Sequence, residues 1–200
     1  MTRAAGHGML GPTMPKDAQA HGAIWRDDGA RYGRVSRLLH WLTLLLLVLS
    51  VPLAIVAADL PASPERLILL TLHRSLGVAV MLILLLRLPW RVYNGWPQTG
   101  PNPWLAKAAR LNHLALYALL AGAIVGGWAY TSASAFAVGL FGLFVLPPLL
   151  APDKELAEIL RQVHQVTVYA LLALIAVHAL AALYHQHMLK DGTLRRMWGK

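Results

Sequence analysis

The sequence predicts an all-α membrane protein, a four-transmembrane-helix bundle with both termini in the cytoplasm. Of the 200 residues, 57% are hydrophobic and 14% are charged, whereas a soluble domain carries about 45–50% apolar and about 25% charged residues. In addition, four stretches meet or approach the roughly 20 apolar residues that a helix needs to cross a bilayer. Basic residues are unevenly distributed between the loops, and this distribution sets the direction of the helices.

The four expected spans cover residues 38–58, 67–86, 111–131 and 160–188. The first has no charge and contains Pro52, where we expect a kink that a bundle tolerates. The second is apolar except for His73 and Arg74. The third begins an uncharged stretch of 42 residues that is too long for one span. We therefore expect an interfacial or re-entrant segment over residues 132–152, interrupted by Pro147–Pro148.

Positive charge dominates the N-terminus, the second loop and the C-terminal tail. The second loop has four basic residues and no acid: Arg87, Arg91, Lys107 and Arg110. The positive-inside rule places all three segments on the cytoplasmic side of a bacterial inner membrane. Topology thus accounts for the net charge of +9, so lipid is an expected partner and nucleic acid is not.

Two further boundaries follow from composition. Residues 1–30 are rich in Gly, Ala, Pro and Asp and lack periodicity, which predicts a flexible cytoplasmic tail. Residues 31–200 are expected to form the membrane domain.

The chain has no cysteine. This excludes disulfides, thiolate zinc sites, iron–sulfur clusters and covalent haem attachment.

Four of the nine histidines lie inside the spans, away from the cytoplasmic ends of the third and fourth: His40, His73, His164 and His178. Ionisable groups in spans are costly, so each is a candidate functional residue, although a lone histidine can also be satisfied by a hydrogen bond across helices. His164 and His178 are 14 residues apart. At about 100° and 1.5 Å per residue, they share one helix face and lie about 21 Å apart.

The topology pairs these histidines across helices. His40 and His178 lie in the inner half of the membrane, and His73 and His164 lie in the outer half. Neutral imidazoles are good iron ligands, and bundles build cofactor sites between facing helices. Two separated pairs favour two bis-histidine haems b over zinc, which prefers four clustered ligands. Such haems conduct electrons across the bilayer.

Cations for the haem propionates stand near both pairs. Arg37 and Arg34 suit the inner haem, Arg74 and Arg161 suit the outer haem, and Arg87 ends the second span on the inner side. Each is equally explained as an interfacial arginine that snorkels. His185 is expected on the same helix face as His178, and His113 lies near the start of the third span. An interfacial histidine beside an inner haem can bind a quinone and carry its proton, or it can simply bind water.

Residues across most of the chain resemble the prokaryotic cytochrome b561 family. The resemblance rests on residues 31–34 with His40-Trp41-Leu42, on His73-Arg74-Ser75-Leu76-Gly77 with Arg87, on the His164–His178 interval and on residues 190–197. It implies that His40 with His178, and His73 with His164, bind two haems b. Some members are similar to superoxide oxidases, which pass electrons from superoxide outside to ubiquinone. That likeness implies an outer basic patch with Arg161 and Arg74 as catalytic residues, and ubiquinone near His185.

Three hypotheses about function remain open at this point. The first is an oxidoreductase that moves electrons from a periplasmic donor, foremost superoxide, to ubiquinone. The second is a cytochrome b subunit that relays electrons between the quinone pool and a partner dehydrogenase or hydrogenase. The third is a non-redox membrane protein whose histidines serve packing, metal binding or proton transport.

Overall fold

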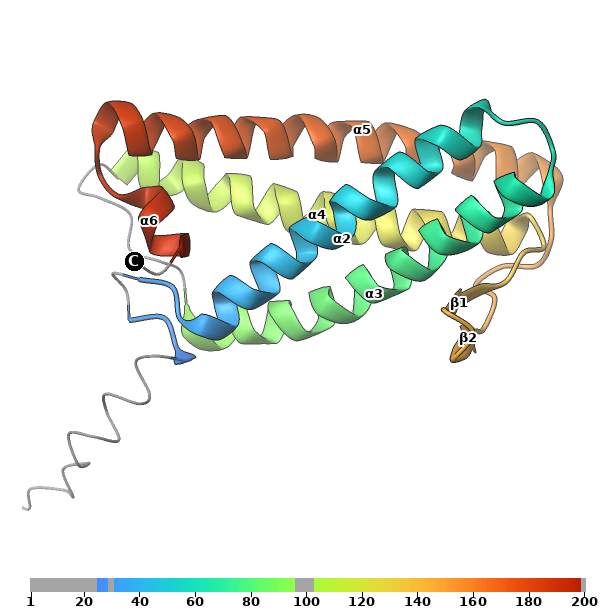
Figure 1. Ribbon diagram of the computed structural model, residues 1–200, viewed down its shortest axis with the longest axis horizontal. Coiled ribbons are helices and arrows are strands. Elements are labelled where there is room, and N and C mark those ends of the chain that lie inside the picture. Colours follow the sequence, from blue (N-terminus) through green and yellow to red (C-terminus); the bar gives the residue numbers. More distant parts are fainter. Residues whose placement is uncertain (1–24, 29–30, 96–102, 199–200) are drawn as a thin grey trace, which may run out of the picture.

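Four long helices make up most of the structure, a computed structural model that describes residues 25–28, 31–95 and 103–198. They are α2 (Arg34–Asp59), α3 (Pro64–Asn94), α4 (Pro103–Ala133) and α5 (Lys154–Tyr184). All four are long and apolar enough to cross a membrane. The predicted fold class, a four-helix membrane bundle, is therefore confirmed (Figure 1).

The first three helices contain the predicted spans and continue beyond them. The fourth begins before the predicted residue 160 but ends at Tyr184, so the predicted residues 185–188 lie in a π-helical turn. Polar side chains cap the starts of α3 and α5. The Ser63 hydroxyl accepts a hydrogen bond from the backbone N–H of Arg66 at the start of α3. The Asp153 carboxylate accepts from the first N–H groups of α5. Such caps satisfy donors that have no partner within the helix. Pro52 lies inside α2, which runs past it to Asp59.

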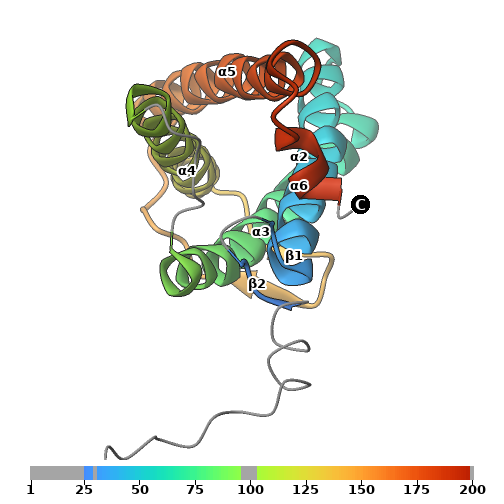
Figure 2. The same cartoon turned by 90° about the vertical axis from the view of Figure 1, so that its left-hand side faces the viewer.

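The helices pack as two close pairs, α2 with α3 and α4 with α5, and α3 also contacts α4. Among the described residues, α2 and α5 are not a closely packed pair of backbones. Figure 2 shows the bundle end-on, with α4 and α5 on one side and α2 and α3 on the other. The buried apolar cluster joins three helices: Val80, Leu84, Leu120, Ala123 and Leu171.

The C-terminal segment folds back over one end of the bundle. A π-helical turn (His185–Leu189) follows α5 directly, and the short helix α6 (Thr193–Trp198) returns beside the start of α2 (Figure 1). Trp41 donates its indole N–H to the Met197 carbonyl over 3.2 Å, and its ring lies 5.1 Å from that of Trp198. The residue after the proposed ligand His40 therefore holds the C-terminal helix.

At the opposite end, the segment after α4 forms a hairpin of strands β1 (Val138–Leu140) and β2 (Phe144–Leu146). The sequence predicts an interfacial or re-entrant segment here and gives no sign of the strands. Phe141 and Gly142 both have positive φ in the turn, 47° and 77°, as a tight hairpin turn requires. Ser75 Oγ accepts the Phe141 N–H over 3.1 Å, which fastens the turn to α3.

The described chain begins before the predicted domain boundary at residue 31. Asp27 accepts a hydrogen bond from the Gly33 N–H and forms an ion pair with Arg91 at 3.3 Å. Its own N–H donates to the Asn94 side chain. Residues 25–28 are thus tied to the end of α3, and residues 1–24 of the predicted flexible tail lie outside the described residues.

Candidate haem-binding sites

The structure brings the four span histidines together in the two predicted pairs. His40 on α2 faces His178 on α5, with ring centroids 6.4 Å apart and planes at 61°. His73 on α3 faces His164 on α5, also at 6.4 Å, with planes at 72°. A metal–nitrogen bond of about 2 Å on either side of one ion places two trans imidazole centres roughly 6 Å apart. Both pairs therefore fit bis-histidine ligation of a haem iron.

The outer pair is held in the tautomer that metal ligation needs. His73 Nδ1 lies 3.0 Å from the Ser50 carbonyl oxygen, and His164 Nδ1 lies 2.9 Å from the Ala123 carbonyl oxygen. A carbonyl oxygen can only accept, so the contact with Ala123 places the proton of a neutral His164 on Nδ1 and leaves Nε2 with a lone pair. His73 Nδ1 also lies 2.9 Å from the Ser50 hydroxyl, and a His73 that donates to the Ser50 carbonyl has the same tautomer. Hydrogen bonds of this kind orient metal-bound histidines in general.

Two glycines leave room around the outer pair. A Cβ on Gly127 of α4 would come within 3.0 Å of Cε1 in the His164 ring, so the imidazole rests against bare backbone. A Cβ on Gly77, one helical turn after His73, would meet no atom within 4 Å. Gly127 on α4 therefore lets the ring of His164 approach the backbone, and Gly77 leaves open space beside α3.

The inner pair is held by side chains. An Arg87 N–H donates to His40 Nδ1 over 3.1 Å, and the same guanidinium lies over the Tyr117 ring, 5.3 Å from its centroid. The Asn112 amide is hydrogen-bonded to His178 Nδ1, also at 3.1 Å. Arg87, a predicted propionate partner, is thus placed at the inner pair and brings a partly buried positive charge to it.

The structure separates the two predicted quinone histidines. The ring of His113 lies 5.3 Å from that of His178, and its Nδ1 donates to the Ala109 carbonyl over 2.7 Å. His185 instead starts the C-terminal turn and bonds Asp191 Oδ2 through Nδ1 at 2.6 Å. His113 is therefore in contact with the inner pair, and His185 belongs to the turn that leads to α6.

The remaining inner arginines lie at the start of α2. Arg37 falls in its first turn, where its N–H donates to the Gly33 carbonyl. Arg34 has its guanidinium 5.6 Å from the centre of the Trp25 ring. Both residues are one or two turns before His40, at the end of the bundle where the inner pair lies.

Of the two predicted catalytic arginines, Arg74 is fastened to the hairpin and Arg161 is paired with an acid. Arg74 donates to the Ala137 carbonyl over 3.2 Å and lies 5.1 Å from the Phe136 ring centre. Arg161 makes two hydrogen bonds to the Glu158 carboxylate, at 2.8 and 2.6 Å. The positive charge of exposed Arg161 is thus balanced by its neighbour.

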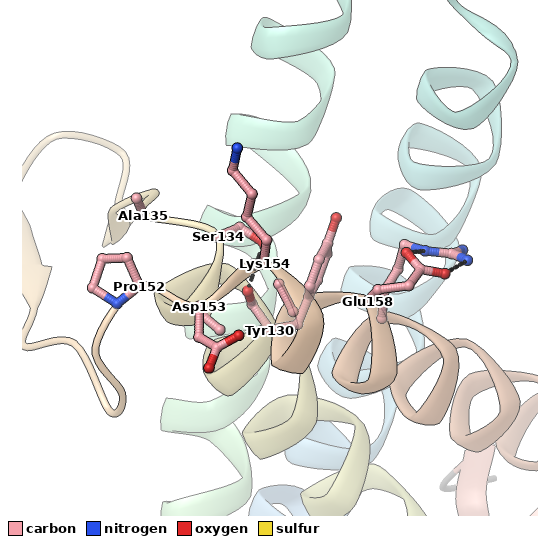
Figure 3. A pocket seen from close by; sticks show the side chains of 10 residues that line it. Tyr130, Ser134, Ala135, Pro152, Asp153, Lys154 and Glu158 are labelled. Atoms are coloured by element: carbon pink, nitrogen blue, oxygen red, sulfur yellow. Dashed lines mark hydrogen bonds and ion pairs between the residues drawn. The ribbon is translucent and has the colours of Figure 1, made fainter.

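A cavity of about 480 Å³ lies beside Arg161, between the end of α4 and the start of α5 (Figure 3). Tyr130, Lys154 and Asp153 line it together with the Glu158–Arg161 pair, and Figure 3 shows these side chains around its mouth. Its lining carries both signs of charge. The cavity is therefore polar, without the uniform positive potential that steers anions most strongly.

The sequence argument missed the groups that hold the ligands. Asn112, Ser50 and the carbonyl of Ala123 each contact a ligand ring, and none is titratable. Asn112 and Ser50 are visible in the sequence as polar residues within spans, and the Ser50 hydroxyl lies 2.9 Å from His73 Nδ1. Backbone carbonyls leave no such signal, because every residue has one.

A four-helix membrane bundle with a histidine pair in each half is the arrangement of a membrane-bound b-type cytochrome. Residues 31–200 match the family model described as prokaryotic cytochrome b561, and the chain belongs to this family. It is accordingly a multi-pass bacterial membrane protein and an oxidoreductase that carries b-type haem and transfers electrons across the membrane.

Curated relatives agree with this assignment. The chain is 32% identical to cytochrome b561 homolog 2 of Escherichia coli K12, in an alignment that covers 85% of this chain and 92% of the relative. It is 29% identical to cytochrome b561 homolog 1 of the same organism, over 84% and 96% of the two chains. It is also 28% identical to the probable superoxide oxidase CybB of Yersinia pestis, over 81% and 92%.

Proposed function

We propose that this protein carries electrons from superoxide on the periplasmic side to ubiquinone on the cytoplasmic side of the bacterial inner membrane, with both termini in the cytoplasm. Two haems b serve as carriers, held by His73 and His164 in the outer half and by His40 and His178 in the inner half. The observation that carries this proposal is the equal 6.4 Å spacing of the two histidine pairs. The relative named as a probable superoxide oxidase supports the choice of donor.

The overall reaction balances with one quinone for two superoxide anions. Each superoxide gives up one electron and becomes dioxygen, and the quinone takes two electrons and two protons to become the quinol. When bound, the haem iron supplies the one-electron chemistry, and the protein sets ligation, burial and access. The ligands on α5 are about 21 Å apart along the helix axis, so two carriers span most of the roughly 30 Å hydrocarbon core.

At the inner site, the protein supplies positive charge and a proton carrier. Arg87 is partly buried and contacts His40 and Tyr117. A cation that is partly removed from water favours a counter-charge, so Arg87 is the leading partner for a haem propionate, with Arg37 nearby. His113 lies with its ring 5.3 Å from that of His178 and is our first choice for the group that protonates the quinone, because it is the titratable side chain in contact with the inner pair. His185 is the second.

At the outer site, Arg74 directly follows the ligand His73 and is held by the hairpin carbonyl of Ala137. We assign it the attraction of superoxide toward the outer haem, because a fixed cation near a site raises the local concentration of an anion. Arg161 and Lys154 line the cavity in Figure 3 and would act from further out, with the charge of Arg161 reduced by Glu158.

The same charge balance favours a second candidate function. The N-cap and first two turns of α5 carry Asp153, Glu155 and Glu158 against Lys154 and Arg161, which is a weak funnel for an anion. In this alternative the chain is a cytochrome b subunit that relays electrons between the quinone pool and a partner dehydrogenase or hydrogenase. Co-purification of a catalytic subunit with the native protein would favour it.

A haem count tests the ligand set first. We expect two b haems per chain in detergent-purified protein, by pyridine haemochrome assay and reduced-minus-oxidised spectrum. His73→Ala and His164→Ala should each lose one haem, the outer one, and His40→Ala and His178→Ala the inner one. A protein without haem after expression with adequate haem supply contradicts the proposal.

The donor is tested by mixing enzymatically generated superoxide with a soluble ubiquinone analogue and following quinol formation. We expect quinol to form at a rate that superoxide dismutase abolishes. Arg74→Gln should slow this rate and leave the haem count at two. No quinol above the protein-free background would leave the relay function as the better assignment.

A further inference from the structure

Both proposed ligands on α5 are hydrogen-bonded to α4, one to a backbone carbonyl and the other to a side-chain amide. His164 donates to the backbone carbonyl of Ala123 at 2.9 Å, and His178 is hydrogen-bonded to the side-chain amide of Asn112 at 3.1 Å. Ala123 and Asn112 are 11 residues apart, which at about 100° per residue puts them on one face of α4. This face of α4 therefore sets the orientation of one ligand in each half of the membrane.

The amide of Asn112 has two atoms that can meet His178 Nδ1. The structure places its Nδ2, a donor, 3.1 Å from this atom. Its Oδ1, an acceptor, takes that place after a half-turn about the last side-chain bond. If Nδ2 donates, Nδ1 holds the lone pair and a neutral ring carries its proton on Nε2. Only Oδ1 leaves Nε2 of a neutral His178 free to bind iron, as the carbonyls do in the outer pair.

We propose that Asn112 is a positioning residue for the inner haem, which holds His178 through Oδ1 and thereby lowers the reduction potential of that haem. The inference rests on the proposed function, because it takes His178 as a ligand. An acceptor on the N–H of an iron-bound imidazole makes the ligand more basic, and a more basic ligand stabilises the oxidised iron.

The other inner ligand has the opposite surroundings. Arg87 lies 3.1 Å from His40 Nδ1, and a guanidinium has no acceptor and keeps its charge. By the same reasoning, a neutral His40 binds iron through Nε2 only when Arg87 donates to another acceptor, such as a haem propionate. A cation next to the site favours the reduced iron, which has one positive charge fewer. Asn112 therefore lowers the reduction potential of the inner haem, whereas Arg87 raises it. That potential depends on two side chains that can each be replaced.

The test is a spectroelectrochemical titration of the full-length holoprotein and of variants at residue 112. Because His73→Ala should lose the outer haem, the redox transition that remains in this variant identifies the inner haem. Asn112→Asp places a stronger acceptor at Nδ1 and should lower the inner midpoint potential. Asn112→Leu removes the acceptor and should raise it. The outer midpoint should not move in either variant.

Asn94→Leu is the matched control, because Asn94 lies near the inner end of α3 and its amide donates to the Trp90 carbonyl. It should leave both midpoints unchanged. Opposite shifts for Asp and Leu, confined to the inner haem, support the proposal, as does loss of the inner haem in Asn112→Leu with retention in Asn112→Asp. Shifts of the same sign, reversed signs or unmoved midpoints overturn it. Fewer than two haems in the parent protein would instead contradict the proposed function.

Discussion

Gly127 faces the imidazole of His164 from the neighbouring helix, four residues after the carbonyl that orients the same ring. We expect Gly127→Ala to weaken binding of the outer haem, because the added methyl would stand 3.0 Å from the ring. Overpacking of this kind costs about 1–3 kcal/mol. The measurement is the haem-to-protein ratio after purification and after a challenge with a haem-binding competitor.

Gly126→Ala is the control for this prediction. A Cβ at Gly126 would stand 3.9 Å from the nearest atoms of His164, an ordinary contact. It should therefore keep both haems. Equal retention of the outer haem in the two variants would mean that the ring does not need the space that Gly127 leaves.

Asp191 closes the C-terminal turn, and its ionisation depends on pH in a defined direction. Burial alone raises the pKa of this carboxyl, but hydrogen bonds from Thr193 and His185 outweigh burial and hold the pKa at about 2. The ordinary value for an aspartate is about 3.9. A lowered pKa stabilises the turn above pH 4 or so, and that stabilisation is lost as the pH falls toward 2.

We therefore expect α6 to loosen between about pH 4 and pH 2. The chain has no cysteine, so a spin label on Arg195→Cys reports this helix alone. Its spectrum should sharpen over that pH range. With Asp191→Asn added, the label should be mobile from neutral pH downward. A parent label that stays immobile at pH 2 would show that other contacts, such as Trp41 to Met197, hold α6.

At the scale of elements, the outer hairpin folds back along α3. Ser75, which accepts the Phe141 N–H, lies 11 residues into α3, or about 16 Å at 1.5 Å per residue. A helix of 31 residues exceeds a roughly 30 Å hydrocarbon core by about 8 Å at each end when centred. The tip of the hairpin then reaches the outer hydrocarbon, and its exposed apolar residues face lipid: Phe141, Leu143 and Val145.

A spin label on Leu143→Cys tests this depth. Leu143 is 78% exposed, and in bilayers we expect its label to be accessible to dissolved oxygen and shielded from a water-soluble nickel complex. The control is Ala62→Cys, in the loop between α2 and α3, which should be open to the nickel complex. Equal exposure of both labels to nickel would place the hairpin in water.

The sequence predicts the helices well and the connections poorly, for a physical reason. Twenty apolar residues in a row have one stable form in lipid, because every backbone group must be paired. The hairpin strands are three residues each, too short for a periodic signal, and their turn places Phe141 at positive φ, which a bulky residue rarely adopts. A contact with Ser75 from another helix holds that turn, so local sequence could not reveal it.

The histidine pairs were predictable because helix period and topology fix depth and face together. Fourteen residues set His164 and His178 on one side of α5, and alternating direction sets their partners. The rotation of α4 has no such marker in the sequence, so the contact of Asn112 with His178 needed coordinates. The same holds for Asp27, which stands in the predicted tail and pairs with Arg91.

At the scale of the whole molecule, the start of α2, the end of α3 and α6 share one end of the bundle (Figure 1). Basic residues gather in these segments, so we expect this end to face the cytoplasm. A green fluorescent protein fused after Lys200 should be fluorescent, and alkaline phosphatase fused there should be inactive. Phosphatase fused after Ala62 should be active. The reverse pattern would invert the direction of electron flow that we propose.

The two histidine pairs also differ in how they respond to mutation over time. Ala123 holds the ring of His164 through its carbonyl oxygen, which any residue at that position still provides, and His73 contacts both the carbonyl and the hydroxyl oxygen of Ser50. Arg87 and Asn112 contact the inner rings through side chains alone, which one codon change removes. Single substitutions can therefore retune the inner centre in small steps, while the outer rings keep their carbonyl contacts.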